Sequence, residues 1–269
     1  MKRMPLEEFF AERASARRPA FMPYVTAGYP SASAMPGIMR MLADAGADCV
    51  EVGVPFSDPV ADGVTIQHAS EVALAKGARL AGALAAAGLA ARAGLRPVLM
   101  SYANPLWQAG LRKLAFRAAD AGAEGVIVPD LPLDAAPAWS RAFARAGLSL
   151  VLFAAPTTTP ERLRRAGRLT RGFLYYVSLA GVTGERKRLA TGLLARVRAV
   201  KAAARVPVCV GFGVATPVQA SQVARAADGV IVGAALVRRL GEWREGAAKR
   251  REIGRWARSM ARSVHSAVR

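Results

Sequence analysis

The chain has 269 residues, of which 38 are Lys or Arg and 19 are Asp or Glu, so its formal net charge is +19. Hydrophobic residues make up 53% of the sequence, which excludes an intrinsically disordered chain and suffices for one large domain over residues 1–269. Uncharged runs are too short, or too interrupted by Pro and Gly, to span a bilayer. Because Cys49 and Cys209 lie in apolar runs, as is typical of buried reduced thiols, we expect a cytoplasmic protein without a membrane segment.

The positive charge by itself suggests an anionic partner such as nucleic acid. However, 32 of the 38 basic residues are Arg, they are spread along the chain, and Ala and Gly are also abundant, as GC-rich codon usage would produce. We therefore expect no nucleic-acid partner. A basic nucleic-acid-binding module is the non-enzymatic alternative, and it predicts tight, steeply salt-dependent binding to DNA or RNA.

The first predicted element is a helix over Leu6–Arg17, with Leu6, Phe9 and Phe10 on one side, where it can cover the floor of the fold. Eight β-rich runs follow, and most are continuously apolar, as in strands that are covered on both faces. In chain order, the predicted strands are Phe21–Ala27, Cys49–Gly53, Pro97–Tyr102, Gly125–Pro129, Leu148–Ala154, Phe173–Ser178, Val208–Gly211 and Gly229–Val232.

Segments of helical period lie between these strands, for example Met35–Ala45 and Gly192–Ala204. Several of them end at a glycine, as in Ala45–Asp48 and Ala121–Glu124, because Gly suits the left-handed position that terminates a helix. The Arg-rich stretch Arg238–Arg269 keeps apolar residues at helical spacing and predicts packed helices. Eight β/α units predict an α/β fold, a closed (β/α)8 TIM barrel with an extra N-terminal helix.

In such a barrel, the active site lies where the strands end. Glu51 lies inside an apolar strand, where burial raises the pKa of a carboxyl group and prepares it for acid–base chemistry; a buried ion pair is the structural alternative. The following loop, Pro55–Gly63, is long for a βα connection and can bring a second carboxylate over the same place. Its aspartates, Asp58 and Asp62, also fit ordinary Asp-Pro and Asp-Gly turns.

Glycine-rich turns follow the last three predicted strands. Backbone N–H groups at such turns and at helix N-termini bind anions, so the pattern predicts a phosphate site. The turns are Gly181–Gly184, Gly211–Gly213 and Gly233–Ala235. The two histidines, His68 and His265, are far apart and no Cys/His cluster accompanies them, so we expect no metal.

Four motifs together indicate a family. They are PYVTAGYP at Pro23–Pro30, EVGVPFSDPVADG at Glu51–Gly63, GVTG at Gly181–Gly184 and GFG at Gly211–Gly213. In order and spacing, the chain resembles the tryptophan synthase alpha subunit over essentially its whole length. The resemblance implies a carbon–carbon lyase of tryptophan biosynthesis, which cleaves indole-3-glycerol phosphate to indole and glyceraldehyde 3-phosphate without a cofactor in this chain.

The resemblance also implies residue roles. Glu51 would be the general acid–base, Asp62 would bind the indole N–H and stabilise positive charge there, and Tyr175 matches the active-site tyrosine of the family. The implied substrate-binding residues are Tyr24, Ile66, Tyr102 and Phe212 at the indole, Gly184, Gly213, Gly233 and Ala234 at the phosphate, and Thr183. On position alone, packing in the core is the commoner explanation for tyrosines placed like Tyr102 and Tyr175.

A partner follows from the resemblance as well: a beta subunit that carries pyridoxal phosphate, receives indole directly and forms an alpha2beta2 heterotetramer. The expected contacts are Asp58, Pro59, Asn104 and Pro105. The chain departs from the family in having Ala234 where serine is usual, which removes a hydroxyl from the phosphate site, and Val64 where proline is common.

Two other enzymatic readings stay open. One is a sugar-phosphate epimerase or isomerase on the same barrel, although such enzymes lack the Pro-Phe-Ser-Asp-Pro segment. The other is a stand-alone lyase that releases indole, which high activity without any partner would support.

Overall fold

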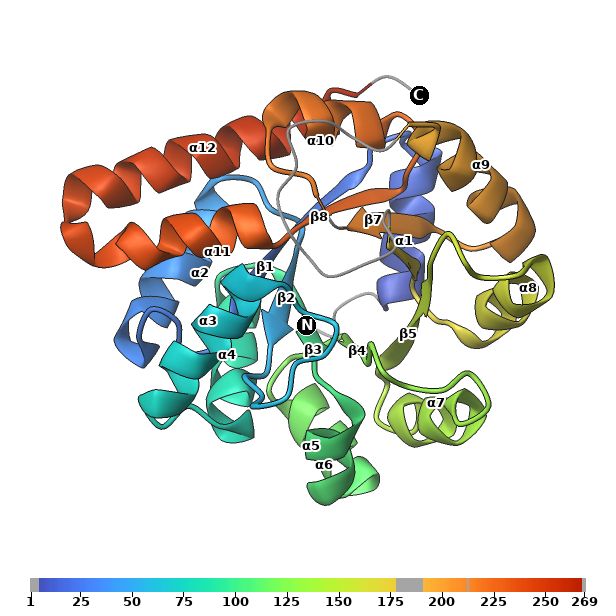
Figure 1. The fold of residues 1–269 in the computed structure, drawn as a ribbon, viewed down its shortest axis with the longest axis horizontal. Helices are drawn as coiled ribbons and strands as arrows, with labels where there is room; N and C mark the ends of the chain where they lie inside the picture. The colour runs from blue at the N-terminus through green and yellow to red at the C-terminus, as the bar shows by residue number, and fades with distance from the viewer. Residues whose placement is uncertain (1–4, 178–190, 212, 268–269) are drawn as a thin grey trace.

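The computed structural model describes residues 5–177, 191–211 and 213–267. Eight parallel strands form a closed barrel in sequence order, and β8 pairs with β1 (Figure 1). The strands are β1 (Ala20–Thr26), β2 (Cys49–Gly53), β3 (Arg96–Met100), β4 (Gly125–Ile127), β5 (Ser149–Ala154), β6 (Leu174–Val177), β7 (Val208–Gly211) and β8 (Gly229–Val232). The barrel prediction is confirmed. β3 ends at Met100 rather than at Tyr102, which is instead the N-cap residue of the next helix.

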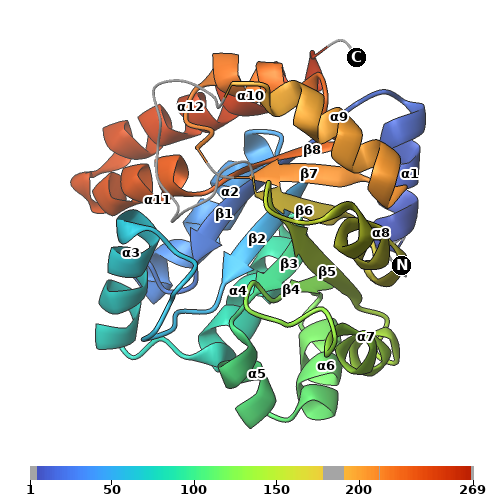
Figure 2. The ribbon, with the colours of Figure 1, turned by 45° about the vertical axis from the view of Figure 1, so that its right-hand side comes forward.

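The helices surround the strands, as Figures 1 and 2 show. They are α1 (Leu6–Ser15), α2 (Met35–Asp44), α3 (Val64–Ala75), α4 (Leu80–Arg92), α5 (Ala103–Gln108), α6 (Leu111–Asp120), α7 (Ala136–Ala144), α8 (Pro160–Leu169), α9 (Leu193–Ala204), α10 (Pro217–Ala224), α11 (Ala234–Gly241) and α12 (Ala247–His265), with short 3-10 helices at Ala32–Ala34 and Glu242–Glu245. Gly46 and Gly122, which follow α2 and α6, both have φ of +90°, as the glycine stop signals predicted. Within the described ranges, α3 and α4 reach the length and hydropathy of a membrane span only as a pair, bent by 108°, and no single helix does so.

The N-terminal helix α1 covers the floor of the barrel, as expected. Its Leu6, Phe9 and Phe10 are buried, and the ring of Phe10 lies 5.2 Å from that of Phe173 at the start of β6. Leu6 packs so closely against Gly172 that a Cβ there would lie 2.7 Å from the leucine Cδ2. The floor is therefore closed by apolar side chains.

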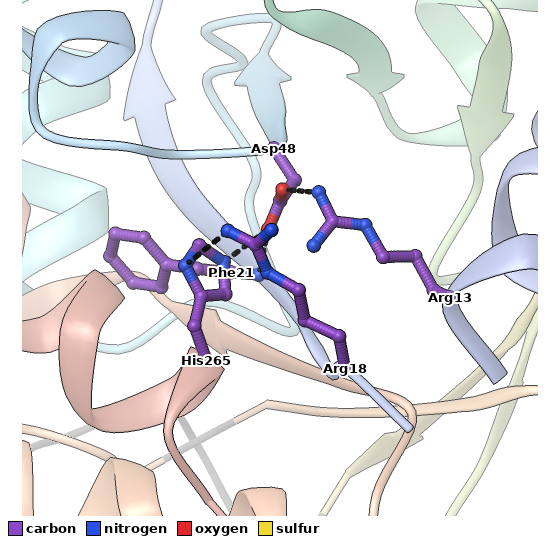
Figure 3. A network of polar contacts seen from close by, with 5 residues as sticks. All are labelled: Arg13, Arg18, Phe21, Asp48 and His265. Atoms are coloured by element: carbon purple, nitrogen blue, oxygen red, sulfur yellow. Dashed lines mark hydrogen bonds and ion pairs between the residues drawn. The ribbon is translucent and has the colours of Figure 1, made fainter. Parts of the chain in front are cut away.

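A buried carboxylate ties the two ends of the chain to this floor. Asp48, directly before β2, accepts hydrogen bonds from the backbone N–H of Phe21 at 2.8 Å and from Nε2 of His265 at 2.7 Å, and pairs with Arg13 (Figure 3). The other ring nitrogen of His265 lies 3.3 Å from the guanidinium of Arg18. Because Arg13 belongs to α1 and His265 to α12, one side chain connects both terminal helices to the first two strands.

Candidate active site

Glu51 lies in the middle of β2 and is 1% exposed. It is in register with Tyr24 on β1 and Val98 on β3, inside a wall of apolar strands. Its Oε1 is buried and has no hydrogen-bond partner among the described residues. The ion pair offered as the alternative explanation is thus not found there, and the carboxyl group is available for chemistry.

The second carboxylate comes from the loop between β2 and α3, as the loop length predicted. Asp62 is 4% exposed, and its Oδ1 also lacks a partner in the described part of the chain. Its backbone is fixed on both sides: its N–H donates to the carbonyl of Pro59 at 3.0 Å, and its carbonyl accepts from Nε2 of Gln67 at 2.8 Å. Asp58, in the same loop, is exposed.

The two carboxyl groups differ in protonation. Burial, with a smaller contribution from the negative charge of Asp62, raises the pKa of Glu51 to about 8. Burial also raises the pKa of Asp62, but a hydrogen bond from Tyr102 opposes it and the pKa is about 6. At neutral pH, Glu51 therefore carries a proton that it can donate, while Asp62 is mostly a carboxylate. Two carboxyl groups set apart in this way provide an acid and an anion in one site.

Two tyrosines reach the same place from opposite sides of the barrel. Tyr24 on β1 and Tyr175 on β6 are both buried, and the charges of Glu51 and Asp62 contribute to raising the pKa of each phenol, after the larger effect of burial. A Cβ on Gly53 would collide with the Tyr24 hydroxyl. A Cβ on Gly211 would collide with that of Tyr175 in the same way. These glycines thus make room for the two phenols.

The predicted phosphate site includes the N-termini of two helices, α10 and α11. The structure shows that these two N-termini differ. The N-terminus of α10 is capped internally: Thr216 accepts from the N–H of Gln219, and the Gln219 side chain accepts from the N–H groups of Ala215 and Thr216. α11 (Ala234–Gly241) has Gly233 as its N-cap residue and no side-chain cap, so no described side chain caps its first N–H groups. An anion is expected to bind α11 rather than α10.

Those of the remaining candidates that fall within the described residues lie around this end of the barrel. Ile66 and Tyr24 both approach Gly233, since a Cβ on that glycine would lie 3.5 Å from Ile66 Cδ1 and 3.8 Å from Tyr24 Cβ. Gly213 has φ of +81°, and Ala234 is half-buried at the start of α11. Thr183, Gly184 and Phe212 lie outside the described residues. In the described segments, no three His, Cys, Asp or Glu side chains gather to hold a metal ion.

Two contacts at the site were not predicted. Phe153 of β5 stacks on Tyr175, with ring centroids 4.5 Å apart, and only its place near the end of an expected strand pointed to it. Tyr102 was expected to line the substrate, but its hydroxyl accepts a hydrogen bond from the N–H of Ala61 at 2.9 Å. Tyr102 therefore also holds the loop that carries Asp62.

Comparisons with known proteins identify the family of the chain. The family model described as tryptophan synthase alpha chain matches residues 10–265. A protein of that name from Roseiflexus castenholzii is 45% identical over 234 residues, which cover 86% of this chain and 90% of the relative. Its counterpart from Phenylobacterium zucineum is 45% identical over 244 residues, 90% of this chain and 88% of the relative. Among solved structures, tryptophan synthase of Mycobacterium tuberculosis superposes with a TM-score of 0.87 at 40% identity, covering 98% of this chain and 99% of that one.

Proposed function

The chain belongs to the tryptophan synthase alpha chain family, and on that premise we propose how its residues carry out the reaction of the family. That reaction is the aldol cleavage of indole-3-glycerol phosphate to indole and glyceraldehyde 3-phosphate, and the protein is a lyase of tryptophan biosynthesis. The observation that carries the residue assignment is the pair of buried carboxyl groups, Glu51 and Asp62, each with an unpartnered oxygen and with different pKa values.

The first step is protonation of the indole ring. Glu51 donates its proton to C3 of the indole, which breaks the aromatic system and places a positive charge on the ring nitrogen. The ionised Asp62 accepts a hydrogen bond from the ring N–H and stabilises that charge. Because both groups are buried, this interaction is stronger than it would be in water.

The second step breaks the carbon–carbon bond. The Glu51 carboxylate, having given up its proton, takes the proton of the side-chain hydroxyl next to C3. The hydroxyl oxygen forms the aldehyde of glyceraldehyde 3-phosphate, and the electrons of the broken bond return to the ring to restore indole. One carboxyl group thus moves both protons and ends the cycle protonated.

The other residues bind the substrate. Tyr175 lies beside both carboxyl groups and completes the catalytic set. The indole is held by Tyr24, Ile66, Tyr102 and Phe212, and the phosphate by Thr183, Gly184, Gly213, Gly233 and Ala234. The uncapped N-terminus of α11 supports the phosphate assignment, because free N–H groups and the helix dipole both favour an anion.

The protein acts with a beta subunit in an alpha2beta2 complex in the cytoplasm, and the pyridoxal phosphate belongs to that partner. One of the solved relatives is a tryptophan synthase in an aminoacrylate-bound form. The expected contact residues Asp58 and Asn104 are exposed. Beside them, Val60 is 76% exposed and Trp107 is 66% exposed, and exposed apolar side chains of this size are typical of a protein interface.

An indole-release assay with purified chain tests the function. We expect slow cleavage of indole-3-glycerol phosphate by the chain alone and faster cleavage with a beta subunit. Glu51→Gln removes the proton donor and is expected to lower the rate about 10²–10⁴-fold. Glu161→Gln, at an exposed position on α8, is the matched control. Unchanged cleavage by Glu51→Gln would refute the mechanism, and full activity without a partner would indicate a stand-alone lyase.

A further inference from the structure

The phenol of Tyr102 connects both ends of the loop between β2 and α3. Its hydroxyl accepts a hydrogen bond from the N–H of Ala61 at 2.9 Å and donates one to the side chain of Asp62. Its ring lies 5.4 Å from that of Phe56, at the start of the same loop. The buried side chain of Tyr102 therefore contacts the loop both at its start, at Phe56, and near its end, where the loop carries the Asp62 carboxylate.

Tyr102 is itself fixed by the next strand. It is the N-cap residue of α5, in extended backbone conformation, and the following N–H, that of Ala103, donates to Oδ1 of Asp130 at 2.8 Å. The preceding N–H, that of Ser101, donates to the carbonyl of Ile127 at 3.0 Å. Asp130 follows β4, so the peptide that carries the phenol is held between β3 and β4.

We propose that Tyr102 is a positioning residue for Asp62, and that Asp130 acts through Tyr102 by holding its backbone. The phenol keeps the carboxylate oriented toward the other carboxyl group and keeps the end of the loop closed over it. The proposal rests on the assignment of Asp62 as the group that stabilises the indole cation. It adds a hydrogen-bonded chain from Asp130 to Asp62, which separates this role of Tyr102 from its contact with the indole.

The charges around Asp62 explain why this hydrogen bond matters. The titratable groups that interact with its carboxylate are Glu51 on β2, Tyr24 on β1, Tyr175 on β6 and Tyr102 itself. None of these is a cation. The Tyr102 hydroxyl lowers the pKa of Asp62, whereas burial raises it. Loss of the phenol would therefore reduce the fraction of Asp62 that is ionised at neutral pH.

The Tyr102→Phe variant of the full chain, with ¹³C-labelled aspartate, tests the proposal. Phenylalanine keeps the ring, and with it the contacts to Phe56 and to the indole, but cannot bond to Asp62. We expect the pKa of Asp62, measured by NMR, to rise above about 6 by about one unit. We also expect kcat to fall at least about twofold at neutral pH with little change in KM, since about half of Asp62 would then be protonated, and the acid limb of the pH–rate profile to move to higher pH.

Tyr176→Phe is the matched control, because Tyr176 is a buried tyrosine of β6 whose hydroxyl bonds to Arg196, away from both carboxyl groups. It should leave the pKa of Asp62 and the acid limb unchanged. For Asp130, alanine removes the acceptor for the Ala103 N–H and should reproduce part of the Tyr102→Phe effect. Asn retains an oxygen that can accept the Ala103 N–H, so Asp130→Asn should keep the wild-type pKa of Asp62 and the wild-type pH–rate profile.

The outcomes separate this proposal from the proposed function. If Tyr102→Phe leaves both the pKa of Asp62 and the acid limb unchanged, Tyr102 does not position Asp62. The same conclusion follows if Tyr176→Phe shifts them equally. If Asp62→Asn instead keeps full activity, the catalytic assignment fails, while the NMR titration still reports whether the phenol holds the carboxylate.

Discussion

Acidic side chains at the two ends of the barrel have opposite surroundings. At the floor, Asp48, Glu124 and Asp228 each directly precede a strand, and each is paired with a cation: Asp48 with Arg13 and His265, Glu124 with Arg96 at 2.5 Å, and Asp228 with Lys201 at 2.8 Å. At the other end, Glu51 and Asp62 each keep a buried oxygen without a partner in the described residues, and no cation is among the groups that shift their pKa values.

Asp48 and Glu51, three residues apart in the chain, show this difference most clearly. Asp48 directly precedes β2 and Glu51 lies in the middle of that strand; the side chain of Asp48 is 5% exposed and Glu51 is 1% exposed. Asp48 accepts hydrogen bonds that connect two helices and two strands, so its charge is stabilised by the fold. Glu51 Oε1 has no such partner in the described part of the chain, and the protonated form of Glu51 is favoured instead. Carboxylates paired with cations thus support the structure at one end, and at the other end carboxyl groups that lack a cationic partner among the described residues are available for chemistry.

The largest effect is expected at the floor. Asp48→Ala leaves Arg13, His265 and the N–H of Phe21 without their acceptor, and breaking a buried ion pair from one side typically lowers the free energy of unfolding by about 3–5 kcal/mol. Urea unfolding measures this loss. At a temperature where the variant stays folded, its rate of indole release should remain close to that of the wild type.

A surface ion pair provides the control. Asp134 pairs with Arg165 at 2.6 Å, but its side chain is 77% exposed, so Asp134→Ala should lower the free energy of unfolding by less than about 1 kcal/mol. Similar losses for the two variants would show that the floor network stabilises the fold no more than an ordinary surface pair. The claim that the partnered carboxylates at the floor support the structure would then be wrong.

At the opposite end of the barrel, Glu51 should make the free energy of unfolding fall as the pH rises. The pKa of Glu51 is 4.5 for an unperturbed glutamate and about 8 in the fold, so between these pH values the folded chain binds a proton that the unfolded chain has lost. Stability from this group is therefore full below pH 4.5 and falls through pH 8. Glu51→Gln removes this dependence, and relative to the wild type it should gain about 3 kcal/mol between pH 4.5 and pH 7.

Urea unfolding of both proteins at pH 5 and pH 8 measures the difference. The expected result is a free-energy difference that grows in favour of Glu51→Gln as the pH increases. A difference that is the same at both pH values would mean that Glu51 ionises normally in the fold.

The smallest effect concerns the phosphate end. Ala234→Ser adds a hydroxyl to the first turn of α11, whose N-terminus is uncapped, and one added hydrogen bond of about 1 kcal/mol corresponds to roughly a fivefold lower KM for indole-3-glycerol phosphate. Val218→Ser places a hydroxyl on the exposed first turn of α10, which is capped internally, and should leave KM unchanged. Equal KM values for both variants would place the phosphate elsewhere.

Local chemistry was enough to predict the strands, the helix stops and the burial of Glu51. A continuous apolar run such as β2 identifies a strand by itself, and a carboxylate within it is conspicuous. The stop signals at Gly46 and Gly122 depend only on the conformational freedom of glycine. The length of the following loop indicated that a second carboxylate could lie over the same strand end, but it did not choose between Asp58 and Asp62.

Contacts between distant residues were not predictable in this way. Asp48 and His265 are 217 positions apart, and nothing in either local sequence indicates the other. The Tyr102 hydroxyl bonds to a residue 41 positions earlier, so the sequence pointed to its ring but not to its hydrogen bond. Likewise, α10 and α11 both follow glycine turns, and only the side-chain geometry of Gln219 shows that α10 satisfies its own N-terminus.

The pH dependence of kcat/KM for indole release tests the central claim most directly, since it reports the ionisation of the free enzyme. Protonation of Asp62 below about pH 6 removes the anion, and deprotonation of Glu51 above about pH 8 removes the proton donor. The account predicts a bell-shaped profile with limbs near these values. A profile that stays flat from pH 5 to 9, or that continues to rise beyond pH 8, would contradict it.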